Sequence, residues 1–404
     1  MFKNTNLVIL FFTMVVMMLG FGIVIPIMPF FVTHYGAGGS ALGAMMAIFS
    51  IMQFFFSPIW GDLSDRYGRK PILMLGVFGN AVSMVMFGLA TNLELMLLSR
   101  ALAGILSSAT LPTAMAFISD STTERDRGQG MGLIGAAMGV GMIIGPGIGG
   151  WLGGSNLAAP FFLAAGLSLA AALLIWAILP ESLPVEKRVI HPGRAVRMPD
   201  FRMMFRSLYG PIGFLLFLAF LVNFALSNFE GIFGLYAKER YAYGPEQVGA
   251  VLTVIGVIST IIQGAITGPA TRWLGDEKVI LLSLIGTAAG FVLMLVAQSF
   301  AAVLLTVGFF VFTNAMLRPA IASLTSKRTP GSQGMAMGLN NSYQSLGRVI
   351  GPLWAGFFID VNLLLPYASA AVIMLVSFAL ATARIRAKPV EMEAESAPAP
   401  QLGD

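Results

Sequence analysis

Apolar stretches of roughly 20 residues or more recur along this chain, separated by short polar or glycine-rich segments. A hydrocarbon core about 30 Å thick needs about 20 apolar residues per helix, and within lipid each helix must satisfy its own backbone hydrogen bonds. The stretches lie near residues 7–31, 41–60, 71–90, 94–118, 131–152, 158–180, 209–236, 247–268, 278–298, 300–322, 336–359 and 363–383. The sequence therefore predicts an all-α integral membrane protein with twelve transmembrane helices.

The composition excludes several other classes of protein. With 57% hydrophobic and 11% charged residues, the chain is too apolar for a soluble globular domain. It has no cysteine and only two histidines, His34 and His191, so we expect no metal site and no cofactor. The net charge of +5 does not indicate a nucleic-acid partner, because the basic residues lie in short segments between apolar stretches.

The segment GPGIGG, Gly145–Gly150, matches the dinucleotide-binding pattern G-x-G-x-x-G. That pattern requires a preceding strand and an acid about 20 residues later, whereas here it lies in the charge-free run 131–152 and the next acid is Glu181. We interpret it as a surface for close helix packing with a proline bend. The alternative is that glycine is merely common in membrane helices. The predicted packing residues are Gly141, Gly145, Pro146, Gly149 and Gly150.

The distribution of basic residues predicts the orientation in the membrane. If the N-terminus is cytoplasmic, the outer segments hold only Lys238 and Arg240, and the inner segments hold nearly all other bases outside the apolar stretches. Loops on the cytoplasmic side of a membrane carry an excess of lysine and arginine. We therefore expect a protein of a bacterial cell membrane with both termini on the cytoplasmic side. Three bases, Arg100, Arg318 and Arg348, lie within predicted spans instead.

An internal repeat divides the chain into two similar halves. A shift of about 207 positions places Gly61 on Gly268 and Gly68 on Gly275, and a similar shift places Gly145-Pro146 on Gly351-Pro352. Two repeated six-helix bundles are typical of transporters that rock around a central site. The predicted parts are a bundle over 1–180, a basic linker over 181–208, a second bundle over 209–383 and a disordered cytoplasmic tail over 384–404.

Four segments carry a resemblance to a known family: GDLSDRYGRK at 61–70, LLSRALAG at 97–104, GMIIGPGIGG at 141–150 and LGFGIVIPIMP at 19–29. Together they resemble the major facilitator superfamily, in particular its drug:proton antiporters of the Bmr/NorA-like multidrug branch. The resemblance implies a monomeric two-bundle transporter in the lipid bilayer. It also implies an antiporter that exchanges protons for lipophilic small molecules or drugs and contributes to antibiotic resistance.

The segment at 61–70 is expected to control the inner face. Gly61 and Gly68 permit tight turns, Asp65 can face the positive N-terminus of a neighbouring helix, and Arg69 can bridge to Asp120. The resemblance implies an interbundle latch that closes the inner face. The alternative is that these charges only orient the protein. The predicted latch residues are Gly61, Asp65, Arg66, Gly68, Arg69 and Asp120.

Glu230 is the most informative single residue, because it lies inside the span 209–236 with no base within several residues. An ionisable group inside a membrane span indicates a functional site. The resemblance implies that Glu230 carries the proton and contacts the substrate. The alternative is a structural role as the partner of Arg348 or Arg100, because buried ions must pair.

Further candidates for substrate contact lie within other spans. Relatives keep an acid three residues before the Arg318-Pro319 pair, but this chain has Ala315 there. Arg348 adds a positive charge that neutralises Glu230 or favours an anionic or zwitterionic substrate. Arg100 can polarise a network with Gln53 or only tie down backbone carbonyls, and each amide can simply hydrogen-bond across helices. The predicted substrate-binding residues are Glu230, Arg100, Gln53, Asn223, Asn340, Tyr343 and Arg348.

The sequence thus predicts a proton-coupled exporter of lipophilic small molecules. One alternative keeps the fold and transports an endogenous metabolite such as a sugar, an amino acid or a siderophore, which Arg348 and Ala315 favour. A remote alternative is a polytopic membrane enzyme, which needs acids, histidines or cysteines clustered at an interface. The sequence contains no such cluster, so we do not expect an enzyme.

Overall fold

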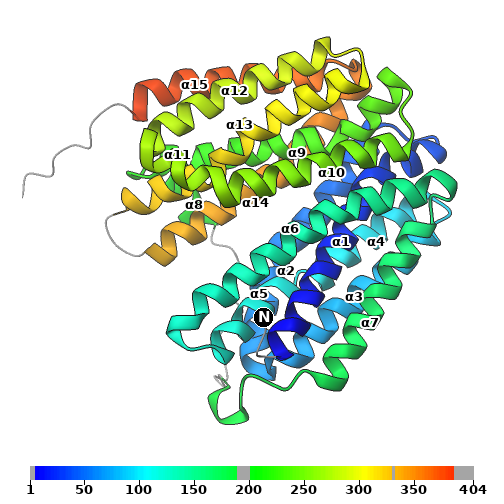
Figure 1. Cartoon of the computed structure of the whole chain (residues 1–404), viewed down its shortest axis with the longest axis vertical. Helices are drawn as coiled ribbons and strands as arrows, with labels where there is room; N and C mark the ends of the chain where they lie inside the picture. The colour runs from blue at the N-terminus through cyan, green and yellow to red at the C-terminus, as the bar shows by residue number, and fades with distance from the viewer. Residues whose placement is uncertain (1–4, 189–200, 330–332, 386–404) are drawn as a thin grey trace, which may run out of the picture.

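The structure, a computed structural model, describes residues 5–188, 201–329 and 333–385, and this part of the chain is almost entirely helical (Figure 1). The first half contains α1 (Thr5–His34), α2 (Gly39–Tyr67), α3 (Arg69–Gly88), α4 (Leu93–Ser107), α5 (Thr110–Ser121), α6 (Glu124–Ser155) and α7 (Ala159–Ile178). A short turn, η1 (Val185–Lys187), and α8 (Phe201–Ser207) follow. The second half contains α9 (Gly213–Tyr241), α10 (Pro245–Ile261), η2 (Ile262–Ile266), α11 (Thr267–Leu274), α12 (Asp276–Val296), α13 (Phe300–Lys327), α14 (Gln333–Val361) and α15 (Leu365–Ile385).

These helices correspond to the twelve predicted spans. Eleven segments of the described chain are long and apolar enough to cross a membrane. The twelfth is α14, which has 29 residues but carries several polar side chains along its length, among them Asn340, Gln344 and Arg348. The prediction of twelve membrane helices is therefore confirmed, and α14 is the one that its composition marks least clearly.

Two predicted spans are interrupted in ways that the apolar pattern did not indicate. The span predicted over 94–118 is divided into α4 and α5. The span predicted over 247–268 changes from α10 to the π-helical η2 before α11 begins. Pro112 and Pro269 lie in the first turns of α5 and α11, where the missing amide hydrogen is tolerated and a new helical segment begins.

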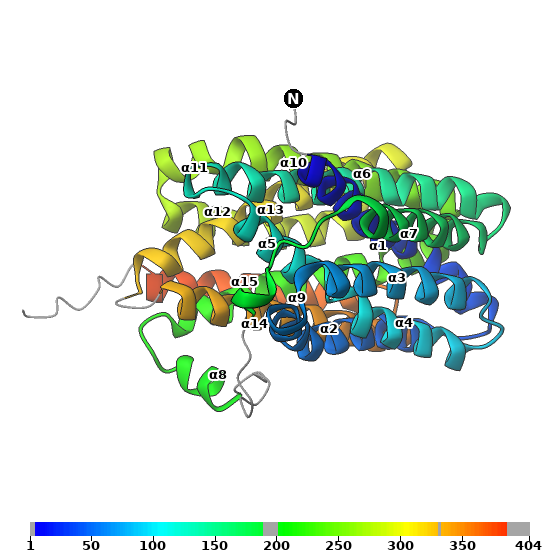
Figure 2. The same cartoon turned by 90° about the horizontal axis from the view of Figure 1, so that it is seen from below.

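The helices form two bundles that meet toward one end and separate toward the other, on the left of Figure 1. The first bundle contains α1 to α7, and the second contains α9 to α15. Figure 2 shows α8 outside both bundles. Residues 189–200 of the predicted linker and 386–404 of the predicted tail lie outside the described residues, so those boundaries stay predictions.

The repeat seen in the sequence reappears as equivalent helix packing. A side chain on Gly145 of α6 would begin 2.8 Å from the carbonyl oxygen of Leu19 on α1. A side chain on Gly351 of α14 would begin 2.7 Å from the carbonyl oxygen of Phe224 on α9. In each half a glycine followed by proline thus packs against the backbone of the first helix of that half. Gly68 and Gly275 also match, since both join two helices with positive φ, 106° and 81°.

A matched pair of substitutions on α6 tests this packing. We expect Gly145→Ala to lower the free energy of unfolding by about 1–3 kcal/mol, because its Cβ would press on the backbone of α1. Gly135→Ala is the control, since no other atom lies within 4 Å of the site of its Cβ and alanine favours a helix more than glycine does. Unfolding of both variants in detergent would be followed by circular dichroism. Equal stability of the two variants would contradict the assignment.

Candidate functional site

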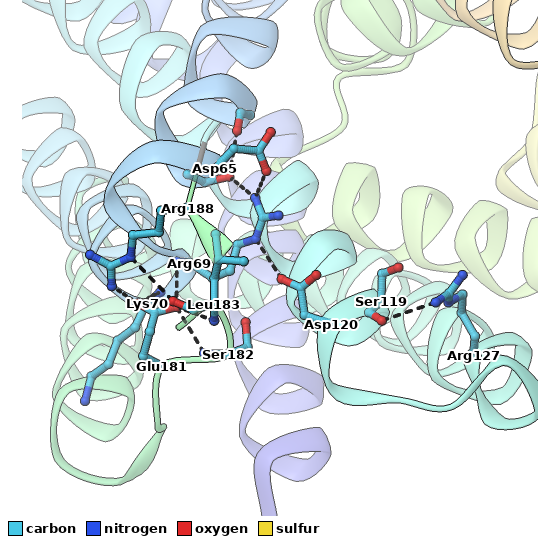
Figure 3. A network of polar contacts seen from close by, with 12 residues as sticks. Asp65, Arg69, Lys70, Ser119, Asp120, Arg127, Glu181, Ser182, Leu183 and Arg188 are labelled. Atoms are coloured by element: carbon cyan, nitrogen blue, oxygen red, sulfur yellow. Dashed lines mark hydrogen bonds and ion pairs between the residues drawn. The ribbon is translucent and has the colours of Figure 1, made fainter. Parts of the chain in front are cut away.

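A charged network joins three predicted latch residues at one end of the first bundle (Figure 3). Arg69, the first residue of α3, donates from Nε to the Asp120 carboxylate at 2.9 Å. Its Nη1 pairs with the Asp65 carboxylate at 2.5 Å and donates to the Ser64 hydroxyl at 2.7 Å. Arg69 is only 7% exposed, so its charge is held mainly by these partners.

Glu181 completes this network, although the sequence analysis predicts no role for it beyond the start of the linker. Its carboxylate accepts hydrogen bonds from the backbone amides of Arg69 at 2.8 Å and Lys70 at 3.2 Å, and so caps the N-terminus of α3. A side chain on Gly68 would collide with this carboxylate. Gly68 is therefore needed both for its positive φ and for the space that Glu181 occupies.

One expectation about the 61–70 segment is corrected, and another stays a prediction. Gly61 does not form a turn, because α2 continues to Tyr67 and only Gly68 separates it from α3. The i,i+4 pair between Arg66 and Asp62, at 2.7 Å, lies on this last part of α2 and supports it. The hydrogen bonds and ion pairs described for Arg69 stay within the first bundle, so a latch between bundles remains a prediction for a different arrangement.

At the other end of the molecule the two bundles are joined directly. The Asp360 carboxylate, near the C-terminus of α14, accepts hydrogen bonds from the amides of Gly39 at 2.6 Å and Ser40 at 2.8 Å. The Ser40 hydroxyl also donates to it at 2.6 Å. Asp360 thereby caps the N-terminus of α2 from the opposite bundle. Nearby, the Lys238 ammonium donates to the Thr33 hydroxyl at 2.6 Å, which links α9 to α1.

Glycines allow the same ends of the bundles to cross at close range. Side chains on Gly39 and Gly43 of α2 would collide with the α14 backbone. A side chain on Gly150 of α6 would begin 2.9 Å from the Cα of Gly249 on α10. Of the predicted packing residues, Gly141, Gly145 and Gly149 face α1, whereas Gly150 faces the second bundle.

The opposite halves of these helices are apart. No other atom lies within 4 Å of the position that a Cβ would take at Gly61, Gly132, Gly135, Gly268 or Gly338. These glycines lie on α2, α6, α11 and α14, toward the end that carries the Arg69 network. Together with the diverging bundles in Figure 1, this places the described structure in a state closed at the Asp360 end and open at the Arg69 end.

Glu230 lies between these two ends on α9 and is half-buried. It interacts electrostatically with Arg318 on α13 and Arg348 on α14. Within the described residues, however, it has no ion pair within 4.0 Å and no hydrogen-bond partner. Gly231, the next residue, lies beside Met46 of α2 and Pro352 of α14. Glu230 is therefore next to the contact between the bundles.

The two neighbouring arginines are held by neutral groups. Arg318 donates to the side-chain carbonyl of Gln344 at 3.1 Å, and Arg348 donates to the Ser345 hydroxyl at 2.9 Å. Both guanidinium groups are half-buried. The sequence analysis lists Arg318 only as a base within a span and not as a site residue. Its position inside an apolar stretch, which it shares with Arg348, is the signal that could have identified it.

Arg100 lies in the first bundle and does not form the expected network with Gln53. Its guanidinium carbon lies 4.5 Å from the centre of the Phe49 ring, and its Nε is buried with no hydrogen-bond partner. The cation–π contact replaces the amide partner that we expected. Phe49 is on α2 one turn from Met46, so Arg100 and Gly231, the residue after Glu230, approach the same stretch of α2 from different bundles.

The remaining predicted substrate contacts have separate surroundings. Asn223 donates to the carbonyl of Ala219 on its own helix at 3.1 Å. Asn340 is buried, and its Oδ1 has no hydrogen-bond partner. Tyr343 donates to the carbonyl of Met204 at 2.7 Å and packs in the cluster that attaches α8 to α14. The structure thus brings Glu230 together with Arg318 and Arg348, and it places Tyr343 at the linker helix.

Two repeated bundles, closed at one end and open at the other, with charged side chains between them, define a secondary transporter of the alternating-access class. The Major Facilitator Superfamily model matches residues 10–273 and 215–401, and the chain belongs to this superfamily. It is a multi-pass membrane transporter of small molecules and not an enzyme.

Bacterial relatives cover nearly the whole chain. Multidrug resistance protein 1 of Bacillus subtilis is 34% identical over 385 residues, which span 94% of this chain and 96% of that protein. Multidrug resistance protein 2 of the same organism is 33% identical over 94% of both chains. The quinolone resistance protein NorA of Staphylococcus aureus is 29% identical, over 90% of this chain and 92% of its own. The resemblance inferred from the sequence is therefore confirmed.

Among solved structures, the nucleoside transporter NupG has the same fold. It superposes with a TM-score of 0.76 at 14% identity, over 95% of this chain and 100% of its own. The predicted fold of two six-helix bundles is confirmed by this likeness.

Two arginines of the 61–70 segment provide a test of the charged network. We expect Arg69→Gln to lower the free energy of unfolding by about 1–3 kcal/mol, because Asp65 and Asp120 lose their charged partner. Arg66→Gln should change it by less than about 1 kcal/mol, since Arg66 and Asp62 form a half-exposed pair. Denaturation in detergent would measure both changes. An equal or larger effect of Arg66→Gln would show that the Arg69 network does not stabilise the bundle.

Proposed function

We propose that this chain exports lipophilic small molecules, including drugs, in exchange for protons. The observation that carries the proposal is Glu230, a carboxyl deep in a membrane helix, half-buried near the bundle contact and without a hydrogen-bond partner among the described residues. A carboxyl in this position can take up and release a proton as its exposure changes. The multidrug and quinolone resistance names of the relatives support drugs as the cargo.

In the proposed cycle, substrate and proton compete for the Glu230 carboxylate. The deprotonated form binds substrate, and protonation favours its release. The coupling between two ligands is reciprocal. If bound substrate lowers the affinity for the proton, the bound proton must lower the affinity for substrate by the same factor. We propose that a single chain completes this cycle as a monomer, with the cavity between its own two bundles as the transport path.

The two ends of the bundles supply the alternating gates in this proposal. With both termini in the cytoplasm, the open end beside Arg69 faces the cytoplasm, and the closed end at Asp360 faces outward. The described state would then be inward-open. Opening the outer side requires the Asp360 cap on α2 to break and the glycine crossings to separate.

Export of an endogenous metabolite is the second candidate. The observation that favours it is the pair Arg318 and Arg348, which no carboxylate approaches within 4.0 Å in the described part of the chain. Transport assays with lipophilic dyes, amino acids and sugars would separate the two candidates.

Substitution of Glu230 tests the coupling. In inverted vesicles with an imposed pH gradient, we expect Glu230→Gln to reduce gradient-driven uptake of dye at least about tenfold, which corresponds to roughly 1.4 kcal/mol. Exchange of labelled for unlabelled dye without a gradient should persist, because an amide can still contact substrate. Glu239→Gln, an exposed acid on the same helix, is the control. Gradient-driven uptake equal to that of the wild type would exclude Glu230 from coupling.

Substitution of Asp360 tests the outer gate. The chain has no cysteine, so spin labels attach only to cysteines introduced at Thr91 and Gln298, exposed residues in loops of the two bundles at the closed end. We expect Asp360→Asn to shift the distance distribution between the labels to longer values, because the α2 cap loses its charge-assisted hydrogen bonds. Glu94→Gln, within the first bundle, should leave it unchanged. An identical distribution in Asp360→Asn would contradict the proposed gate.

A further inference from the structure

The balance of charge deep within the helices is strongly positive. The ionisable groups set well inside the helices near the bundle contact are Glu230, Arg100, Arg318 and Arg348. Three guanidinium groups against one carboxylate leave a net charge of +2, and protonation of Glu230 increases it. Charges inside a membrane protein pair with one another or face a polar ligand or water. This net positive charge therefore indicates a negatively charged partner.

No protein carboxylate forms a direct ion pair with Arg318 or Arg348 in the part of the chain that the structure describes. Arg318 and Arg348 interact electrostatically with Glu230, but both donate to neutral acceptors, Gln344 and Ser345. Arg318 and Arg348 also repel each other. Both residues are half-buried.

The surroundings of these arginines add further hydrogen-bonding groups on the same helix faces. Asn314 precedes Arg318 by one turn of α13, and Gln344 precedes Arg348 by one turn of α14, so each pair shares a face. The Nδ2 of Asn314 is buried without a hydrogen-bond partner. The Arg318–Gln344 hydrogen bond joins the two faces into one surface. An unpaired amide donor one turn from Arg318 adds to the guanidinium donors that match the acceptor oxygens of an anionic group.

We propose that the substrates of this transporter carry a carboxylate or similar anionic group on an apolar body, and that Arg318 and Arg348 bind that group. This inference rests on the proposed export function and specifies its substrate class. The planar guanidinium group pairs with a carboxylate through two parallel hydrogen bonds, which gives selectivity as well as affinity. A purely cationic molecule would instead meet two unneutralised positive charges beside Glu230. A substrate that also carries an amine can place the amine on Glu230, in competition with the proton.

A matched pair of dyes tests the substrate class. A rhodamine with a free carboxyl group and its methyl ester share one cationic ring system and differ in the anionic group. Binding to the purified full-length protein in detergent would be measured by fluorescence polarisation. We expect the acid to bind about tenfold more tightly than the ester, because charge-assisted hydrogen bonds are made only with the carboxylate. Tighter or equal binding of the ester would overturn the proposal.

Variants assign the preference to named residues. Arg348→Gln and Arg318→Gln should each reduce the preference for the acid to within about twofold, and Arg348→Lys should keep part of it because the charge remains. Arg127→Gln, an exposed arginine at the start of α6, is the control. Unfolding midpoints identify variants that fail to fold. A preference that survives in both folded glutamine variants would also overturn the assignment.

Binding and transport separate this inference from the proposed function. Preferential binding of the acid without gradient-driven export would remove the proposed antiport and leave the substrate class standing. Gradient-driven export of the ester with no preference for the acid would contradict the substrate class and leave the proposed antiport standing.

Discussion

Contact between helix backbones at glycine is the interaction on which the rest of the structure depends. Lipid is as apolar as the side chains, so it provides little drive for helices to associate, and close van der Waals packing must replace it. Gly145 brings α6 onto α1, and Gly351 brings α14 onto α9 in the second bundle. Each bundle is thereby built around the same crossing. Gly150 and Gly249 use the same device between the bundles, and Gly256 of α10 packs on the α6 backbone further along.

This placement separates what stays rigid from what moves. The crossings inside a bundle lie along its first helix, and they can persist while the bundles tilt. The bundles meet along two long helix pairs, α6 with α10 and α2 with α14. In the described residues the polar contacts between them are local: the Asp360 cap on α2 and the bond from Lys238 to Thr33. At the opposite end, Arg69 already has acceptors within its own bundle, so its charge is neutralised while the bundles are apart. Separation at that end therefore leaves no buried guanidinium unpaired.

The sequence predicted features that depend on neighbours along the chain, and among distant contacts it predicted the Arg69–Asp120 bridge but missed two helix caps. Apolar length identified the membrane helices, and an acid inside an apolar run identified Glu230. Glu181 was missed because the amide that it caps is 112 residues away, and Asp360 because its partner is 321 residues away. Gly68 was assigned to a turn correctly. Gly61 was not, because nothing in its local sequence shows that α2 continues through it.

The surroundings of Glu230 also depend on contacts between residues that are far apart in the sequence. A carboxylate in direct contact with a guanidinium group is stabilised as an ion and exchanges its proton reluctantly. Here the neutral Gln344 and Ser345 hold Arg318 and Arg348, and Glu230 stays within electrostatic range of both without touching either. Within the described residues the carboxyl oxygens of Glu230 therefore form no ion pair with either arginine. The hydrogen bonds to neutral acceptors on α14 support the proposal that a coupling acid and an anion-binding surface lie side by side between the bundles.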